Sequence, residues 1–169
     1  MRALVAVRFV AVFSTGLLAG IFFGDRMGAS FARPALSPSS FVTFQQVQHV
    51  HFVRMMPFLV GIAILASIVW LVLIRSRIGT ASFLFLALAT LAFISVAVLT
   101  RTVNVPINNQ LMTWSTSSPP PDMMQIWARW EQVHTVRTVM AILGFACELF
   151  AFGTSRNGRA KDSRSRSSG

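Results

Sequence analysis

Aromatic and ionisable side chains recur at helical spacing near the end of this sequence. Their positions alternate in steps of three and four residues, which places them on one face of a helix. In a chain that is 54% apolar and only 12% charged, we expect the His and Arg of this face to point into a bundle or a wet cavity rather than at lipid. The alternative is that the tryptophans form an interfacial aromatic belt and the arginine reaches the lipid headgroups. The face consists of Trp127, Trp130, His134, Arg137, Ala141, Gly144, Glu148 and Ala151.

Two asparagines lie on either side of a proline that follows the third apolar stretch. Asn104 and Asn108 enclose Pro106, which disfavours helical geometry in the residue before it and is expected to leave backbone carbonyls free. The two amides then either cap the end of a helix or point inward as neutral donors to a ligand oxygen. A further polar group precedes the second apolar stretch and consists of Gln45, Gln46, Gln48, His49, His51 and Arg54.

The spacing of the available ligands argues against a metal centre. Glu131 and His134 form one Glu-x-x-His half-motif, but di-iron bundles need two copies and two further carboxylates. His49 and His51 are two residues apart, so they diverge by about 200° on a helix. Cys147 is the single cysteine, which excludes a multi-thiolate site and an intrachain disulfide. The sequence therefore predicts no metal.

Four apolar stretches must position these side chains. Each is close to the roughly 20 residues that a helix needs to cross a bilayer, and backbone in lipid must be helical. The charged share of 12% is far below the roughly 25% of ordinary soluble domains. We therefore predict an all-α protein, an integral membrane four-helix bundle forming one domain over residues 1–155, with the second and fourth helices extended on the outer side. The expected spans are residues 4–24, 55–74, 78–100 and 133–152.

The first apolar stretch carries a glycine at every fourth position. This spacing predicts a smooth ridge along which a neighbouring helix can approach closely. The alternatives are a flexible gate or a cleaved signal peptide with a basic start and small residues after its apolar stretch. The glycines are Gly16, Gly20, Gly24 and Gly28.

The placement of the cations predicts the orientation in the membrane. With both termini in the cytoplasm, the inner segments 1–8, 75–79 and 153–169 hold nine of the 15 Lys and Arg residues. The longer outer segments, 25–54 and 101–137, hold the other six. Because cytoplasmic loops are enriched in cations, we expect a multi-pass protein of the cell membrane with both termini cytoplasmic.

Two ionisable residues are expected near the inner ends of the helices. Arg8 lies about one turn into the first span, and Glu148 lies about one turn from the end of the fourth. A lone buried carboxylate is costly, so we predict that these two residues form a structural ion pair, with Arg75 or Arg77 as the fallback partner. A proton-relay role is the alternative. Residues 156–169 are rich in Ser and Arg and are expected to form a disordered tail attracted to anionic lipids.

Several motifs combine into a pattern with a known counterpart. Residues 104–108 read Asn-Val-Pro-Ile-Asn, a Pro-rich loop follows Trp114, and residues 130–138 read Trp-Glu-Gln-Val-His-Thr-Val-Arg-Thr. The Gln-rich start of the second helix and the Arg-Met-Met-Pro step at 54–57 belong to the same pattern. The combination resembles the anthrone-oxygenase-like family of small four-helix membrane proteins, in which most bacterial members are a domain of unknown function. The resemblance covers nearly the whole chain up to residue 155.

The resemblance implies a cofactor-free oxidation of an anthrone to an anthraquinone by O2. Such a reaction needs a base for an acidic C–H proton, donors for the resulting oxyanion and an aromatic-lined pocket. By position, His134 would be the base, with His49 and His51 in reserve, and Arg137 and Asn108 would be the oxyanion partners. The residues expected to bind the substrate are Asn104, Trp114, Trp127, Trp130, Gln45, His49, His51 and Arg54.

The expected partners are the lipid bilayer and an apolar aromatic small molecule at the outer mouth of the bundle, with no nucleic acid. One rival is a non-catalytic membrane subunit or small-molecule carrier, and another is a structural lipid-facing protein. An enzyme requires a closed pocket that joins His134 to an aromatic-sized cavity. A carrier requires a polar route to the inner side, for which Ala141 and Gly144 offer few groups.

Overall fold

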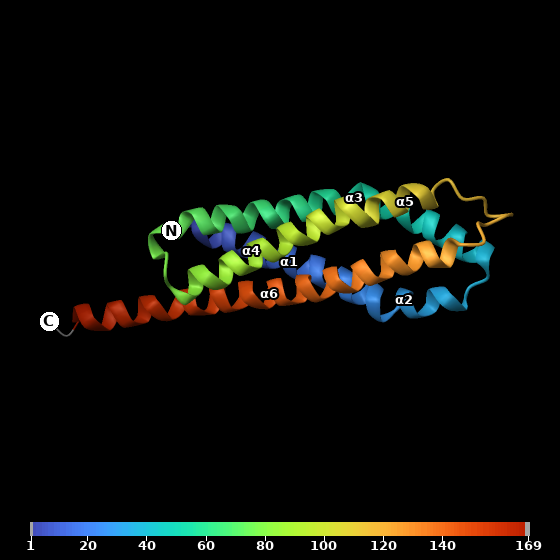
Figure 1. Cartoon of the computed structure of the whole chain (residues 1–169). Helices are drawn as coiled ribbons and strands as arrows, with labels where there is room; N and C mark the ends of the chain where they lie inside the picture. The colour runs from blue at the N-terminus through green and yellow to red at the C-terminus, as the bar shows by residue number, and fades with distance from the viewer. Residues whose placement is uncertain (1, 168–169) are drawn as a thin grey trace.

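The computed structural model describes residues 2–167, with side chains from 2 to 154, and it consists of four long helices that run side by side (Figure 1). The described residues contain no strand. Short helices lie in the connections: α2 (Ala29–Ala32), η1 (Arg33–Ala35), η2 (Arg75–Arg77), η3 (Thr100–Asn104) and α5 (Val105–Leu111). The long helices are α1 (Arg2–Met27), α3 (Pro38–Leu73), α4 (Ala81–Leu99) and α6 (Met123–Ser167). We call the end that holds α2, α5 and the loop 112–122 the loop end, and the end that holds η2 the turn end.

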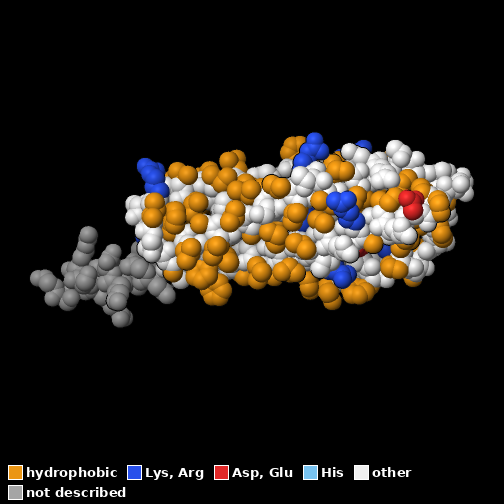
Figure 2. Space-filling model, viewed as in Figure 1, with side chains coloured by type: hydrophobic (Ala, Val, Ile, Leu, Met, Phe, Trp, Pro, Cys, Tyr) orange, Lys and Arg blue, Asp and Glu red, His pale blue; other side chains and the backbone are white. Residues whose placement is uncertain are grey.

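Four helical segments are long and apolar enough to cross a membrane. Large apolar side chains cover the outside of the bundle, as Figure 2 shows on the face in view. Phe9, Phe58 and Leu65 are all more than 60% exposed, which is tolerable where the surrounding medium is hydrocarbon. These features confirm the prediction of an all-α bundle in a lipid bilayer. The segments are Arg2–Ala35, Pro38–Leu73, Ala81–Leu111 and Met123–Thr154.

The connection between α3 and α4 is a tight turn at the turn end. Gly79 has a φ of +90°, which an L side chain rarely adopts. The Thr80 hydroxyl then accepts a hydrogen bond from the Phe83 amide and caps the start of α4. At the loop end, Ser37 caps α3 in the same way by accepting from the Ser40 amide. α3 and α4 therefore form an antiparallel hairpin.

Pro106 does not end the third span, contrary to the prediction from the sequence. The chain widens into a π-helical turn over η3 and continues through α5 to Leu111. Proline has no N–H to give to the preceding turn, and its ring crowds the carbonyl four residues back. A π-turn changes the spacing at this point and lets the helix continue. Asn104 consequently stays within the bundle, where it is 1% exposed.

The repeating face on α6 points into the bundle, as predicted. His134 and Arg137 are 3% and 5% exposed, and Ala141, Glu148 and Ala151 are fully buried. The small residue at Gly144 lets α4 come close, because a Cβ there would lie 3.0 Å from the Phe93 ring.

The glycine ridge on α1 was predicted wrongly for three of its four members. A Cβ at Gly16 would lie 2.9 Å from the Phe145 ring, but at Gly20 and Gly24 it would meet nothing within 4 Å. At Gly28 it would meet only the Gly24 carbonyl oxygen of its own segment. The reason is geometric: a step of four residues turns by about 40° more than one full helical turn, so the row winds away from a straight contact.

Glu148 is held by hydroxyl groups, which corrects the predicted ion pair with Arg8. Thr15 Oγ1 lies 2.6 Å from Glu148 Oε2, and Ser67 Oγ lies 2.5 Å from Oε1. The ion pairs found among the described residues do not join Glu148 to any Arg. The Arg8 guanidinium lies 5.4 Å from the centre of the Trp70 ring. The carboxyl group still joins α1, α3 and α6 through these two contacts, and its structural role stays a prediction.

The predicted disordered tail, 156–169, falls on residues whose side chains the structure does not describe. The backbone of α6 runs to Ser167, and residues 168–169 lie outside the described residues altogether. The disorder of this segment stays a prediction.

Candidate functional site

A cavity of about 320 Å³ lies in the loop-end half of the bundle. This volume is at the lower end of the range, roughly 300–1,000 Å³, that small-molecule sites occupy. All four long helices contribute to its lining, and most of the lining is apolar. The lining residues are Ile21, Phe22, Asp25, Gln45, Gln48, His49, Phe52, Val53, Met56, Pro57, Val60, Ala97, Thr100, Arg101, Asn104, Val105, Asn108, Leu111, Trp127, Trp130, His134 and Arg137.

The cavity brings together most of the residues expected to act on or bind a substrate. Those that line it are Gln45, His49, Asn104, Asn108, Trp127, Trp130, His134 and Arg137, and Gln48 of the polar group on α3 lines it as well.

Three of the expected binding residues lie elsewhere. His51 and Arg54 are exposed, because the face of α3 that lines the cavity passes through positions 45, 49, 52, 56 and 60. Trp114 is 7% exposed and packs in an apolar cluster with Phe41 and Ile107 next to the cavity.

Three rings form a stacked column along one wall of the cavity. The Trp127 and Trp130 rings are 4.4 Å apart at an interplanar angle of 15°. The Trp130 and His134 rings are 4.8 Å apart at 27°. The steps of three and four residues on α6 place these rings one above the other. Trp130 is the middle ring of the column, so a flat aromatic guest meets the ring edges of this wall and packs against them edge-to-face.

Each ring nitrogen of His134 lies close to one charged side chain. Nδ1 lies 3.0 Å from Nη2 of Arg137, and Nε2 lies 3.2 Å from Oδ2 of Asp25. Arg137 is itself anchored, because its Nη1 donates a 2.7 Å hydrogen bond to the Thr100 hydroxyl.

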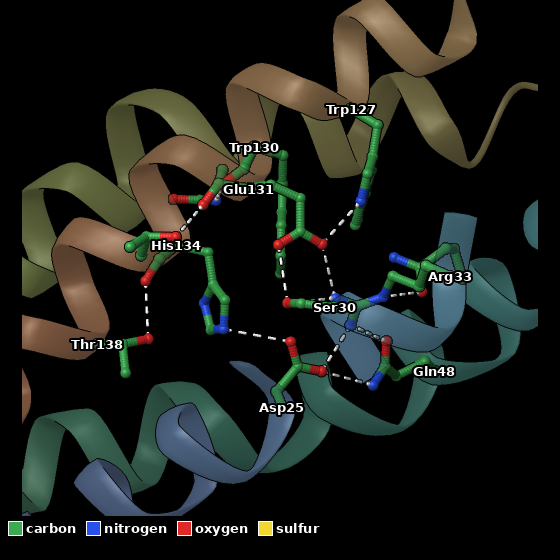
Figure 3. A network of polar contacts seen from close by, with 12 residues as sticks. Asp25, Ser30, Arg33, Gln48, Trp127, Trp130, Glu131, His134 and Thr138 are labelled. Atoms are coloured by element: carbon green, nitrogen blue, oxygen red, sulfur yellow. Dashed lines mark hydrogen bonds and ion pairs between the residues drawn. The ribbon is translucent and has the colours of Figure 1, made fainter. Parts of the chain in front are cut away.

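Asp25 belongs to a buried ionic network that the sequence analysis missed (Figure 3). At its centre is Arg33, which is 2% exposed. Its Nη2 donates to Asp25 Oδ1 over 2.6 Å, and its Nη1 donates to Glu131 Oε1 over 2.8 Å. Its Nε donates to Gln45 Oε1 over 2.9 Å. Both carboxylates contact the Arg33 guanidinium, and the buried Arg137 guanidinium is linked to Asp25 only through His134. With these two cations nearby, burial of the two carboxylates is tolerable.

One signal in the sequence could have pointed to this network. The chain has only five Asp and Glu residues, and an acid is costly in so apolar a protein unless it is paired. Asp25 and Glu131 both lie at the loop end of long helices. The short α2–η1 segment folds back so that Arg33 reaches both of them, and a local pattern does not predict that return.

Five buried polar atoms of the lining residues lack a hydrogen-bond partner in the described part of the chain. Two of them, His134 Nε2 and Asp25 Oδ2, face each other at 3.2 Å as an ion pair. The other three are Asn104 Oδ1, Trp130 Nε1 and Arg137 Nε. Buried polar atoms in folded proteins are rarely left unpaired. One acceptor and two donors therefore lie unpaired on side chains that line the cavity. No group of three or more His, Cys, Asp or Glu side chains among the described residues is placed to hold a metal ion.

The fold and the cavity define a class: a four-helix membrane protein with a cavity that has an aromatic and ionic wall near one end. Comparison with protein families is more specific. The family model for anthrone oxygenase matches residues 44–147, which is more than half of the chain, and the chain belongs to this family. Neither the curated proteins nor the solved structures provide a match. The matched segment includes His134 and Arg137, whereas Asp25 and Arg33 precede it.

Proposed function

We propose that this protein uses O2 to oxidise a flat aromatic substrate of the anthrone type in the loop-end cavity. The observation that carries the proposal is the cavity itself, whose lining is largely apolar except for the wall that holds His134, Arg137 and Asn104. A fused-ring ketone fits the apolar lining and the polar wall, because its rings can pack against the tryptophans and its oxygen can accept hydrogen bonds from Arg137 and Asn108.

The reaction needs no group beyond the side chains and O2. A base takes the acidic C–H proton opposite the ketone, and the negative charge spreads to the ketone oxygen. The carbanion adds O2 to give a peroxide anion, which takes the proton back from the base. The resulting hydroperoxide loses water and leaves a second carbonyl. Anthrone and O2 thus give anthraquinone and one water, with no external reductant. His134 is the proposed base, and Arg137 with Asn108 stabilises the oxyanion.

The test is oxidation of anthrone by the purified protein in lipid nanodiscs, followed by O2 uptake and by quinone absorbance. His134→Gln is expected to lower kcat by about 10²–10⁴-fold, the usual contribution of a general base. His51→Gln is the matched control, because His51 is exposed on α3 and does not line the cavity. Equal activity of wild type and His134→Gln, or no turnover above a protein-free control, would reject the proposal.

We further propose that both termini are cytoplasmic, so that the cavity lies near the outer surface of the cell membrane. The support is the excess of Arg and Lys in the short inner segments. In a Cys147→Ala background, a membrane-impermeant thiol reagent is expected to label Ser117→Cys in intact cells and Ser76→Cys only after lysis. The reverse pattern would overturn this orientation.

A further inference from the structure

We infer that Asp25 is the positioning residue of His134: it holds the imidazole in the tautomer protonated on Nε2 and keeps the lone pair on Nδ1. This goes beyond the proposed function, which names His134 without assigning its reacting atom. It also brings into the site a residue outside the segment, 44–147, that the family model matches.

The partners of the two ring nitrogens determine the tautomer. A guanidinium group only donates hydrogen bonds, so His134 Nδ1, 3.0 Å from Arg137 Nη2, must be the acceptor. The proton of the neutral ring is then on Nε2, which faces the Asp25 carboxylate at 3.2 Å. The opposite tautomer would set a ring N–H against the guanidinium and a lone pair against the carboxylate.

Two neighbouring side chains fix the orientation of the Asp25 carboxylate for this contact. Its Oδ1 accepts from Arg33 Nη2 at 2.6 Å and from Gln48 Nε2 at 3.2 Å, which leaves Oδ2 for the imidazole. Figure 3 shows the carboxylate between these groups and His134.

The imidazole ring is also held by its aromatic neighbours. Trp130 stacks on one side at 4.8 Å between ring centres, and Phe22 packs edge-on at 5.6 Å. A flipped ring would place carbon atoms against both polar partners.

The same geometry shows how Nδ1 could become available, and this step rests on the proposed function. Arg137 lines the cavity, and a substrate oxygen that takes its Nη2 frees the Nδ1 lone pair. Nδ1 then accepts the C–H proton, and the electron pair of that bond passes to the substrate oxygen beside Arg137. The resulting imidazolium faces the Asp25 carboxylate, so each new charge lies next to an opposite one.

The first test measures the tautomer rather than activity. The chain has three histidines, so ¹⁵N-histidine NMR of the full-length protein in nanodiscs resolves them, and His134→Gln assigns the signal. Wild-type His134 is expected to be protonated on Nε2 and bare on Nδ1. A wild-type spectrum with the proton on Nδ1, or with both nitrogens protonated, overturns the inference without any variant.

The variant Asp25→Asn is expected to change the tautomer of His134. Arg33 and Gln48 both donate to the Oδ1 position, so the amide oxygen is expected to stay there and the NH₂ group to face Nε2. Nε2 must then accept, and the His134 proton is expected to move to Nδ1. Asp122→Asn, an exposed acid outside the cavity, is expected to leave the spectrum unchanged. An unchanged tautomer in Asp25→Asn would contradict the inference.

Activity separates this inference from the proposed function. Asp25→Asn is expected to lower kcat for anthrone by about 10²–10⁴-fold with little change in KM, as for an orienting carboxylate in a catalytic triad. Nε2-protonated His134 in a wild type that oxidises no anthrone would reject the function and keep the inference. If the wild type oxidises anthrone but resting His134 carries its proton on Nδ1, the proposed function is kept and the inference is rejected.

Discussion

Replacing Arg33 with methionine is expected to lower the free energy of unfolding by about 3–5 kcal/mol, the usual effect of removing one partner of a buried ionic group. The Arg33 guanidinium contacts both Asp25 and Glu131 and is 2% exposed. Methionine keeps a similar length and apolar stem but leaves both carboxylates without this cation. The measurement is equilibrium unfolding of the purified protein in mixed detergent micelles, followed by circular dichroism.

Two further variants make the Arg33 result interpretable. Arg54→Met removes an exposed cation from α3 and is expected to change stability by less than about 1 kcal/mol. Arg33→Met combined with Asp25→Asn and Glu131→Gln removes all three charges together and is expected to recover part of the loss. If Arg33→Met is as stable as Arg54→Met, the network does not stabilise the fold.

Replacing Glu148 with alanine is expected to cost about 2–5 kcal/mol, because it empties a fully buried position between three helices. Glu148→Gln is the matched control. Its amide has nearly the same shape and offers an acceptor and a donor to the hydroxyls of Thr15 and Ser67. Those hydroxyls also lie within hydrogen-bond distance of the Ala11 and Ala63 carbonyls, so they can donate there and accept from the amide.

The expected cost of Glu148→Gln is therefore below about 1.5 kcal/mol, the net worth of one ordinary hydrogen bond. Unfolding in the same mixed micelles measures both variants. Equal damage by Gln and Ala would mean that the negative charge of Glu148 is needed, as in the ion pair predicted from the sequence.

The sequence by itself determined the bundle and the face of α6 that carries the site. Apolar stretches of membrane-spanning length and a three-four repeat are local properties, and each constrains one helix whatever its neighbours are. This is why the burial of His134, Arg137 and Glu148 could be predicted from numbering alone.

Only the tertiary structure decided which side chains meet. The contact of His134 with Asp25 depends on how α1 and α6 are rotated against each other, and that of Arg33 with Glu131 depends on the return of the α2–η1 segment. Glu148 has hydroxyl partners in place of the expected cation for the same reason. Helix rotation and axial shift are set by packing over the whole interface rather than by spacing within one segment. Numbering along a single helix therefore predicts which residues face the bundle, but the partners they find there are decided by how the helices pack.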